Sequence, residues 1–136
     1  MAAGRQLSKS DRGRLERAVS GAEAATGLQF CVYLGPADGD PRAHAEQLFA
    51  AARARSRPAV MLYVAPEARQ VECVVAPEVT DRITDGTAQA AVDVMLPVLA
   101  RGDVVRGLSE GIRVLADGAG PRRGDESNEE LPDVIG

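Results

Sequence analysis

Three aspartates, Asp81, Asp85 and Asp103, are the side chains of this sequence best suited to chemistry. Asp81 and Asp85 are four residues apart, so they share one face if the turn between them is helical. Carboxylate oxygens are the ligands that Ca²⁺ and Mg²⁺ prefer in proteins. An aspartate at the start of a helix is also a common N-cap, because its side chain accepts a hydrogen bond from the first turn. The residues leave both roles open, and we expect capping.

Arginines offer a second kind of chemistry. Arg53, Arg55 and Arg57 precede an apolar run that starts at Val60, and Arg57 could bind a phosphate or a carboxylate. Alternate residues on a helix do not face one another, and arginine at the carboxyl end of a helix is stabilised by the helix dipole. We therefore expect a solvated helix end, and we keep Arg57 and Glu78 as candidate binding residues.

The remaining reactive side chains are expected to be structural. Cys31 and Cys73 lie in the first and third predicted strands. If the second strand lies between them, their Cα atoms are about 9.5 Å apart. That distance is too long for a disulfide, so both should pack as small apolar groups. His44 is the only histidine, and we expect it to be exposed and without a catalytic partner.

Hydrophobic periodicity and capping residues predict the element order α-β-α-β-β-α-α. Ser8 followed by Asp11 indicates a capping box, and Gly27 indicates the end of that helix. Pro97 should kink the third long helix or unwind it early, since proline costs about 3 kcal/mol inside a helix. We expect helices that begin at Ser8, Asp40, Thr84 and Asp103, the second closing near residue 56, and strands over 29–34, 60–65 and 70–76.

These elements define the fold class. The β-α-β crossover should be right-handed, with the first two strands parallel and the third antiparallel. The continuous apolar strand 60–65 is typical of a central strand, and Glu72 indicates an edge strand whose charge limits edge-to-edge pairing. The predicted class is α/β: a three-layer α/β/α sandwich, with a small mixed sheet, a β-α-β-β core and flanking helices. Residues 1–119 should form this domain and residues 120–136 a flexible acidic tail.

Composition limits the kind of partner. The net charge is −4, and the segment from Pro121 onward carries five acids and two arginines. The nearly neutral remainder lacks the basic face that nucleic-acid binding needs. No stretch approaches the length of a membrane span, and no apolar secretory signal opens the chain, so we expect a cytoplasmic location. The tail ends in a small apolar cluster that could dock on this domain, a second copy or a protein partner: Leu131, Val134 and Ile135.

Several short motifs resemble one known family. The hairpin of residues 60–76 is followed by Ile83-Thr84-Asp85, Leu96-Pro97, Arg101-Gly102-Asp103 and Gly107-Leu108. Their order and spacing over residues 7–117 resemble the TPM domain family. The resemblance implies the same sandwich and a divalent-cation cleft lined by acids, to which Asp85 and Asp103 correspond. Some members are assigned acid-phosphatase activity, in which the metal would hold a phosphate and activate water.

Two stretches depart from that family's pattern. Ser56-Arg57-Pro58-Ala59 stands where relatives carry an Asp-Asn-Gly-like stretch, and Ala76-Pro77-Glu78 stands where relatives have glycines. Three aspartates are few for Ca²⁺, which takes six to eight oxygens. We therefore expect a non-catalytic binding or adaptor domain, without a cofactor, for an unknown protein partner. The alternatives are a weak phosphatase that holds Ca²⁺ or Mg²⁺ at Asp81, Asp85 and Asp103, and a structural homodimer through the edge strand.

Overall fold

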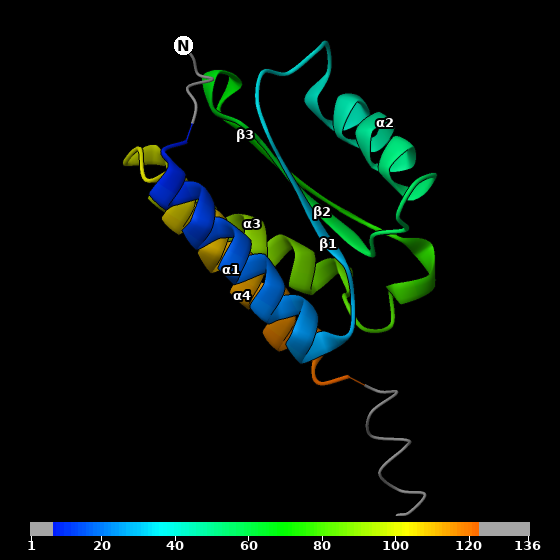
Figure 1. The fold of residues 1–136 in the computed structure, drawn as a ribbon. Coiled ribbons are helices and arrows are strands. Elements are labelled where there is room, and N and C mark those ends of the chain that lie inside the picture. Colours follow the sequence, from blue (N-terminus) through cyan, green and yellow to red (C-terminus); the bar gives the residue numbers. More distant parts are fainter. Residues whose placement is uncertain (1–6, 123–136) are drawn as a thin grey trace, which may run out of the picture.

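The structure is a computed structural model that describes residues 7–122 (Figure 1). Within this range the chain forms four α-helices and one three-stranded sheet in the predicted order, and short 3-10 turns follow β2 and β3. The elements are α1 (Lys9–Thr26), β1 (Phe30–Leu34), α2 (Pro41–Arg53), β2 (Val60–Ala65), β3 (Gln70–Val75), α3 (Asp85–Ala100) and α4 (Val104–Ala119), with the turns at Pro66–Ala68 and Pro77–Val79.

Each α-helix begins where the sequence predicts. The side chains of the four N-cap residues accept a hydrogen bond from a backbone N–H three residues further on, and these residues are Ser8, Asp40, Thr84 and Asp103. Helix α2 ends earlier than expected, at Arg53, because the carbonyl of Ala52 accepts hydrogen bonds from both Arg55 and Ser56 and closes a tighter turn. The capping predictions are confirmed.

Of the two alternatives predicted at Pro97, a kink or early unwinding of α3, the second does not occur. The helix continues past this proline to Ala100. Met95 and Val98 are buried on either side of the proline, and Leu99 lies against Gly107 of α4. This packing along α4 offsets the hydrogen bond that the proline nitrogen cannot make.

The sheet has the order β1-β2-β3. Strands β1 and β2 are parallel, with Phe30 opposite Val60, and β2 and β3 are antiparallel, with Val60 opposite Val75. All six residues of β2 are buried, as expected of a central strand covered on both faces. The predicted pairing and the predicted edge position of β3 are confirmed.

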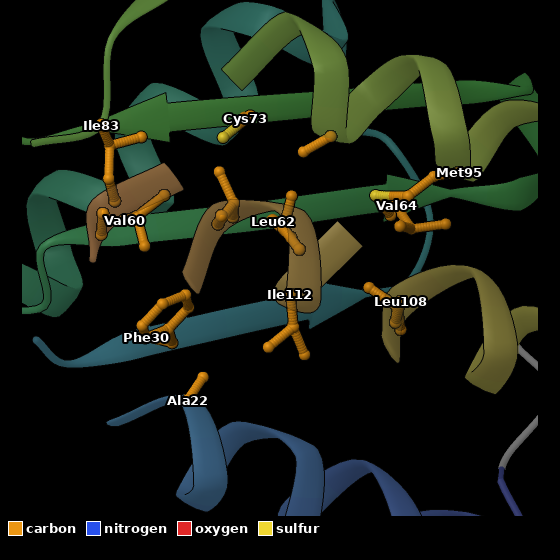
Figure 2. Packing of buried hydrophobic residues seen from close by; sticks show 13 residues of the cluster. Ala22, Phe30, Val60, Leu62, Val64, Cys73, Ile83, Met95, Leu108 and Ile112 are labelled. Atoms are coloured by element: carbon orange, nitrogen blue, oxygen red, sulfur yellow. The ribbon is translucent and has the colours of Figure 1, made fainter. Parts of the chain in front are cut away.

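Helices cover both faces of the sheet and make the three-layer arrangement. Helix α2 lies on one face, and α1, α3 and α4 lie on the other (Figure 1). Alternate residues of β2 serve the two faces: Tyr63 packs towards α2, whereas Leu62 packs into the larger cluster beneath the three helices, where Met95, Leu108 and Ile112 meet it (Figure 2). The molecule is an α/β/α sandwich with two apolar cores.

Two glycines let α4 approach its neighbours closely. A Cβ at Gly107 would lie 2.7 Å from a methyl carbon of Leu99, and one at Gly111 would overlap the sulfur of Met95. Gly111 also faces Leu62 of the sheet. The closest of these contacts are with α3.

A membrane span requires about 20 consecutive apolar residues. Between residues 7 and 122, none of the helices is both long and apolar enough to cross a bilayer.

Candidate functional site

The three aspartates do not meet in one site. Asp85 lies in the first turn of α3, whereas Asp103 follows the last turn and caps α4 by accepting the N–H of Arg106 at 3.2 Å. The 16 residues of α3 separate these two acids by about 24 Å of helix. Asp81 lies at the Asp85 end and is exposed. Nearness in a sequence motif is not nearness in space here, so the three aspartates do not form the metal site of the phosphatase alternative.

The described part of the chain offers no other set of side chains that could bind a metal ion. Among residues 7–122, no group of three or more His, Cys, Asp or Glu side chains is arranged to hold a metal ion. The role that the structure gives to Asp103 is N-capping, the alternative that the sequence favoured. The residues present do not fit the Ca²⁺ or Mg²⁺ site that the resemblance implies.

The candidate binding residues Arg57 and Glu78 lie near the amino end of β2 and have different roles. Glu78 pairs with Arg53, and this hydrogen bond from the guanidinium lowers the pKa of the Glu78 carboxyl below its usual value. Arg53 also donates to the carbonyl of Pro58 at 2.8 Å, so it has a structural role. Arg57 is exposed and has a left-handed backbone, with φ of 60°. The other candidates, Leu131, Val134 and Ile135, lie outside the described residues.

His44 belongs to an aromatic cluster that the sequence analysis missed. Its Nδ1 atom accepts the N–H of Asp38 at 3.1 Å and lies 2.8 Å from the hydroxyl of Tyr63. Because Nδ1 accepts the Asp38 N–H, it carries no hydrogen, so Tyr63 is the donor and the ring proton lies on Nε2. The expectation of an exposed histidine without a partner is therefore wrong.

The same cluster stacks two tyrosines at the carboxyl ends of β1 and β2. The rings of Tyr33 and Tyr63 are parallel within 16°, with centroids 5.0 Å apart, and the Tyr33 hydroxyl donates to the carbonyl of Pro36 at 2.8 Å. Tyr63 is fully buried, and this burial raises the pKa of its phenol. Tyr33 and His44 hold the loop after β1 in place, and the neutral, buried phenol of Tyr63 fixes His44, which is a structural role rather than a catalytic one.

The two cysteines are free, as predicted, and lie on the strands that flank β2. Burial raises the pKa of the Cys31 thiol to about 11 and that of Cys73 to about 12. A nucleophilic cysteine needs a lowered pKa that provides thiolate near neutral pH. Both thiols are therefore packing groups.

An apolar hollow lies at the carboxyl end of β2, on the three-helix face. It has a volume of about 510 Å³ and is bounded by the β2–β3 hairpin and the last turns of α3. Val64 and Val71 line it from the sheet, and Leu96 and Leu99 line it from α3. Within residues 7–122, Leu96 is the one large apolar side chain that is exposed, at 43%. Arg69 places a single cation at this site.

The fold and this hollow define the class of the protein as a small α/β/α sandwich domain with an apolar recess at the end of its central strand. The chain belongs to the family described as a domain of unknown function, DUF5130, whose model matches residues 3–116.

Solved structures from three bacteria have the same fold. The BA42 protein of Bizionia argentinensis is similar at 18% identity, with a TM-score of 0.78 over 91% of this chain and 90% of that one. The N-terminal domain of the cg2496 protein of Corynebacterium glutamicum is similar at 22% identity, with a TM-score of 0.68 over 86% and 76%. The N-terminal domain of a P. gingivalis protein is similar at 17% identity, with a TM-score of 0.65 over 85% and 78%.

Proposed function

We propose that this chain is a non-catalytic binding domain, a divergent relative of TPM domains, that receives an apolar side chain of a protein partner in the hollow beside Leu96. One observation carries the proposal: a large apolar side chain is left exposed at the rim of an apolar recess. Exposed apolar surface of this kind marks binding sites more often than single scattered side chains do.

The chemistry around the hollow specifies the ligand. Its sheet and helix walls are aliphatic, with Val71 on one side and Leu99 on the other, so a branched or aromatic side chain fits best. Arg69 supplies a charge that favours an acidic residue next to that side chain. The expected ligand is a peptide segment with an apolar anchor and a neighbouring acid.

A non-catalytic role agrees with the ionisable groups. The aspartates of the phosphatase hypothesis lie at opposite ends of α3, and burial raises the pKa of both thiols. We also propose a cytoplasmic location, because two free cysteines, one on each face of the sheet, are suited to a reducing compartment.

Selection of peptides on the protein tests this function. A displayed library of random peptides should yield binders with an apolar anchor and an acid, and amide signals of Val71 and Gly102 should shift when such a peptide is added. The variant Leu96→Asp should abolish binding, and Arg69→Ala should weaken it several-fold. The matched control Leu96→Met keeps volume and apolarity, so it should bind within about twofold of the parent.

Two results would contradict the proposal. One is a selected peptide that binds Leu96→Asp as tightly as the parent. The other is a rise in melting temperature with millimolar Ca²⁺, Mg²⁺ or Mn²⁺ that Asp85→Asn abolishes, since ligand binding raises stability by mass action. The second result would restore the metal-dependent phosphatase as the better hypothesis and would justify assays with phosphate esters.

A further inference from the structure

The outer edge of β1 presents backbone groups that β2 does not use. Ala59 donates to the carbonyl of Gln29 at 2.8 Å, and Gly35 donates to the carbonyl of Val64 at 3.1 Å. Residues 29 and 35 therefore direct their backbone towards β2. Because backbone groups alternate in direction along a strand, the N–H and C=O groups of residues 30, 32 and 34 point outwards.

One outward group of this edge already has a partner. The N–H of Phe30 donates to the carboxylate of Glu23, from α1, at 3.0 Å, which confirms the outward direction. Over residues 7–122, no hydrogen bond satisfies the outward groups of Val32 and Leu34. Both side chains are half-buried, so the edge combines partly covered apolar side chains with unpaired backbone.

The surroundings of this edge are largely apolar, with Arg12 and Glu16 of α1 in the hollow beside it and Glu23 at the amino end of the strand. A hollow of about 490 Å³ separates Phe30 and Val32 from Leu15 and Val19 of α1. At the amino end of the strand, Ala59 is bonded to Gln29, and two residues before Ala59 lies the exposed Arg57. An extended segment that is acidic first and apolar afterwards would match this surface.

The chain leaves the domain beside the same end of β1. Arg82 donates to the carbonyls of Ala119, Gly120 and Pro121 at 3.2, 3.0 and 2.9 Å, which fixes the chain after α4. The side chain of Arg122 follows and packs on Gly27: a Cβ built on Gly27 would lie 3.2 Å from its Cγ. Gly27 precedes β1 by only three residues.

We propose that the outward edge of β1 is a docking site for this chain's own segment Leu131–Ile135, which adds to the sheet as a fourth strand. The eight residues 123–130 reach at most about 29 Å, whereas the five residues of β1 are about 16 Å long. The linker therefore reaches either end of the strand. Its acids, which include Glu129 and Glu130, then lie within reach of Arg57.

Pro132 sets the register of the added strand. Proline is tolerated in an edge strand only where its nitrogen faces solvent, so residue 132 and, by alternation, Val134 direct their backbone away from β1. Leu131, Asp133 and Ile135 direct theirs towards it. Strand addition of this kind uses main-chain hydrogen bonds for affinity and alternate side chains for specificity. The proposal does not depend on the hollow beside Leu96.

Amide hydrogen exchange of the full chain of 136 residues tests the proposal residue by residue. The N–H groups of Val32 and Leu34 should exchange at least tenfold more slowly than in the variant Ile135→Pro, which removes an inward N–H. The matched control Val134→Pro removes an outward N–H and should keep most of the protection. Cys31 and Tyr33 already donate to β2, so their exchange should be the same in all three proteins.

Two outcomes would overturn the inference. If Val32 and Leu34 exchange at the same rate in the parent and in Ile135→Pro, the tail does not cover the edge. If both are protected but lose protection on dilution, together with a fall in molecular mass, a second copy covers the edge instead. Both proline variants change only residues outside the domain, so loss of folding cannot explain either result.

Discussion

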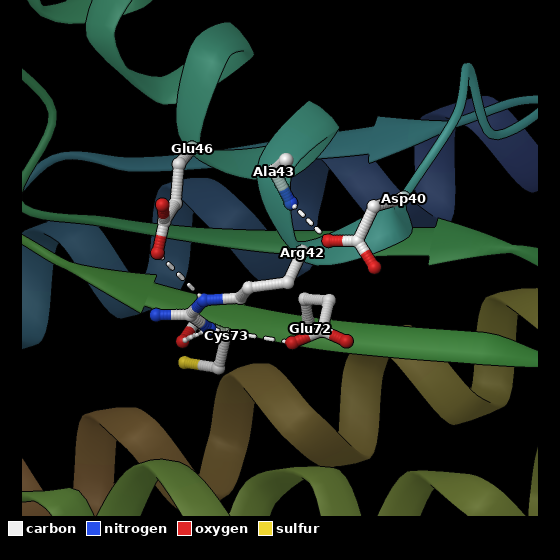
Figure 3. A network of polar contacts seen from close by, with 6 residues as sticks. All are labelled: Asp40, Arg42, Ala43, Glu46, Glu72 and Cys73. Atoms are coloured by element: carbon white, nitrogen blue, oxygen red, sulfur yellow. Dashed lines mark hydrogen bonds and ion pairs between the residues drawn. The ribbon is translucent and has the colours of Figure 1, made fainter.

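The two edges of the sheet are built differently. On β3, Arg42 of α2 donates to the carbonyl of Cys73 at 3.1 Å and pairs with Glu72 at 3.3 Å and with Glu46 at 2.9 Å (Figure 3). Its guanidinium thus covers an outward backbone group with charge. On β1, the carboxylate of Glu23 covers the first N–H, and the rest of the edge has no such cover within residues 7–122.

The β3 edge is therefore protected against pairing with other strands, whereas the β1 edge is available for it. Charged side chains at a sheet edge prevent pairing with other strands, and β3 has them at its centre. An uncovered edge with apolar neighbours is a template for strand addition, and β1 has that character along Val32 and Leu34. A small domain can therefore protect one edge of its sheet and keep the other for binding.

The largest expected effect comes from removing a backbone N–H of β1 that points towards β2, compared with removing one that points outwards. Cys31→Pro removes an N–H that bonds to β2 and should lower the free energy of unfolding by roughly 3 kcal/mol. Val32→Pro removes an outward N–H and should cost clearly less. Urea unfolding of both, with Cys31→Ala as a measure of the lost side chain, gives the comparison. Equal losses would show that the two residues do not differ in backbone direction.

The next effect is the dependence of stability on pH that the thiols of the two edge strands cause. An ordinary thiol has a pKa near 9, and burial raises the values to about 11 for Cys31 and about 12 for Cys73. Above pH 9 the unfolded chain loses these protons first, so stability is complete below pH 9 and falls from there to pH 11 or 12.

Between pH 8 and pH 10 the fall should be about 1 kcal/mol for Cys73 and less for Cys31, whose partial exposure lets water screen the charge. Urea unfolding at both pH values measures the fall. Replacing either cysteine by alanine should make the free energy of unfolding fall less between pH 8 and pH 10. If this fall is unchanged when both cysteines are replaced, the raised pKa values are contradicted. Tyr63 adds to the fall above pH 10, because burial raises its pKa as well.

A further effect of similar size concerns the covered end of β1. Glu23→Ala leaves the N–H of Phe30 without its acceptor and should destabilise the domain by about 1–2 kcal/mol. Glu23→Gln keeps a carbonyl oxygen at the same place, so it should cost less than half as much. Thermal unfolding measures both, and exchange of the Phe30 amide should quicken only in the alanine variant. An equal loss in both would assign the effect to charge instead of to the hydrogen bond.

The smallest effect on stability concerns the β3 edge. Arg42→Ala should lower the free energy of unfolding by about 0.5–1 kcal/mol, because its ion pairs are exposed and screened by water. Its larger consequence should be self-association, as the Cys73 carbonyl becomes available to other strands. Sedimentation at several concentrations measures this association. Arg42→Lys, which keeps the charge, should remain monomeric under conditions in which Arg42→Ala associates.

Much of the fold was predictable because its signals are local. Each N-cap lies directly before its helix, as Thr84 does before α3, and the continuous apolar run of β2 marks a central strand within six residues. The early unwinding considered at Pro97 is absent for the opposite reason. Packing of α3 on α4 involves residues that are distant in sequence, and it outweighed a local preference.

The candidate sites were less predictable because they depend on distances across the fold. Helix length places Asp85 and Asp103 far apart, although both belong to short motifs of the same region. His44 and Tyr63 are 19 residues apart. One signal could have found this cluster: Tyr33 and Tyr63 occupy equivalent positions in two predicted parallel strands, and the structure pairs them.

Arg82 has a mechanical consequence. Its guanidinium bonds three successive carbonyls at the end of α4, at 3.2, 3.0 and 2.9 Å, and these bonds resist a pull on the carboxyl end together instead of one after another. Tension applied there therefore passes through Arg82 to the base of α3 before it can unwind α4. At the other end, within the described residues, α1 is held by the local capping contacts between Ser8 and Asp11. The domain should yield to force first at its amino end.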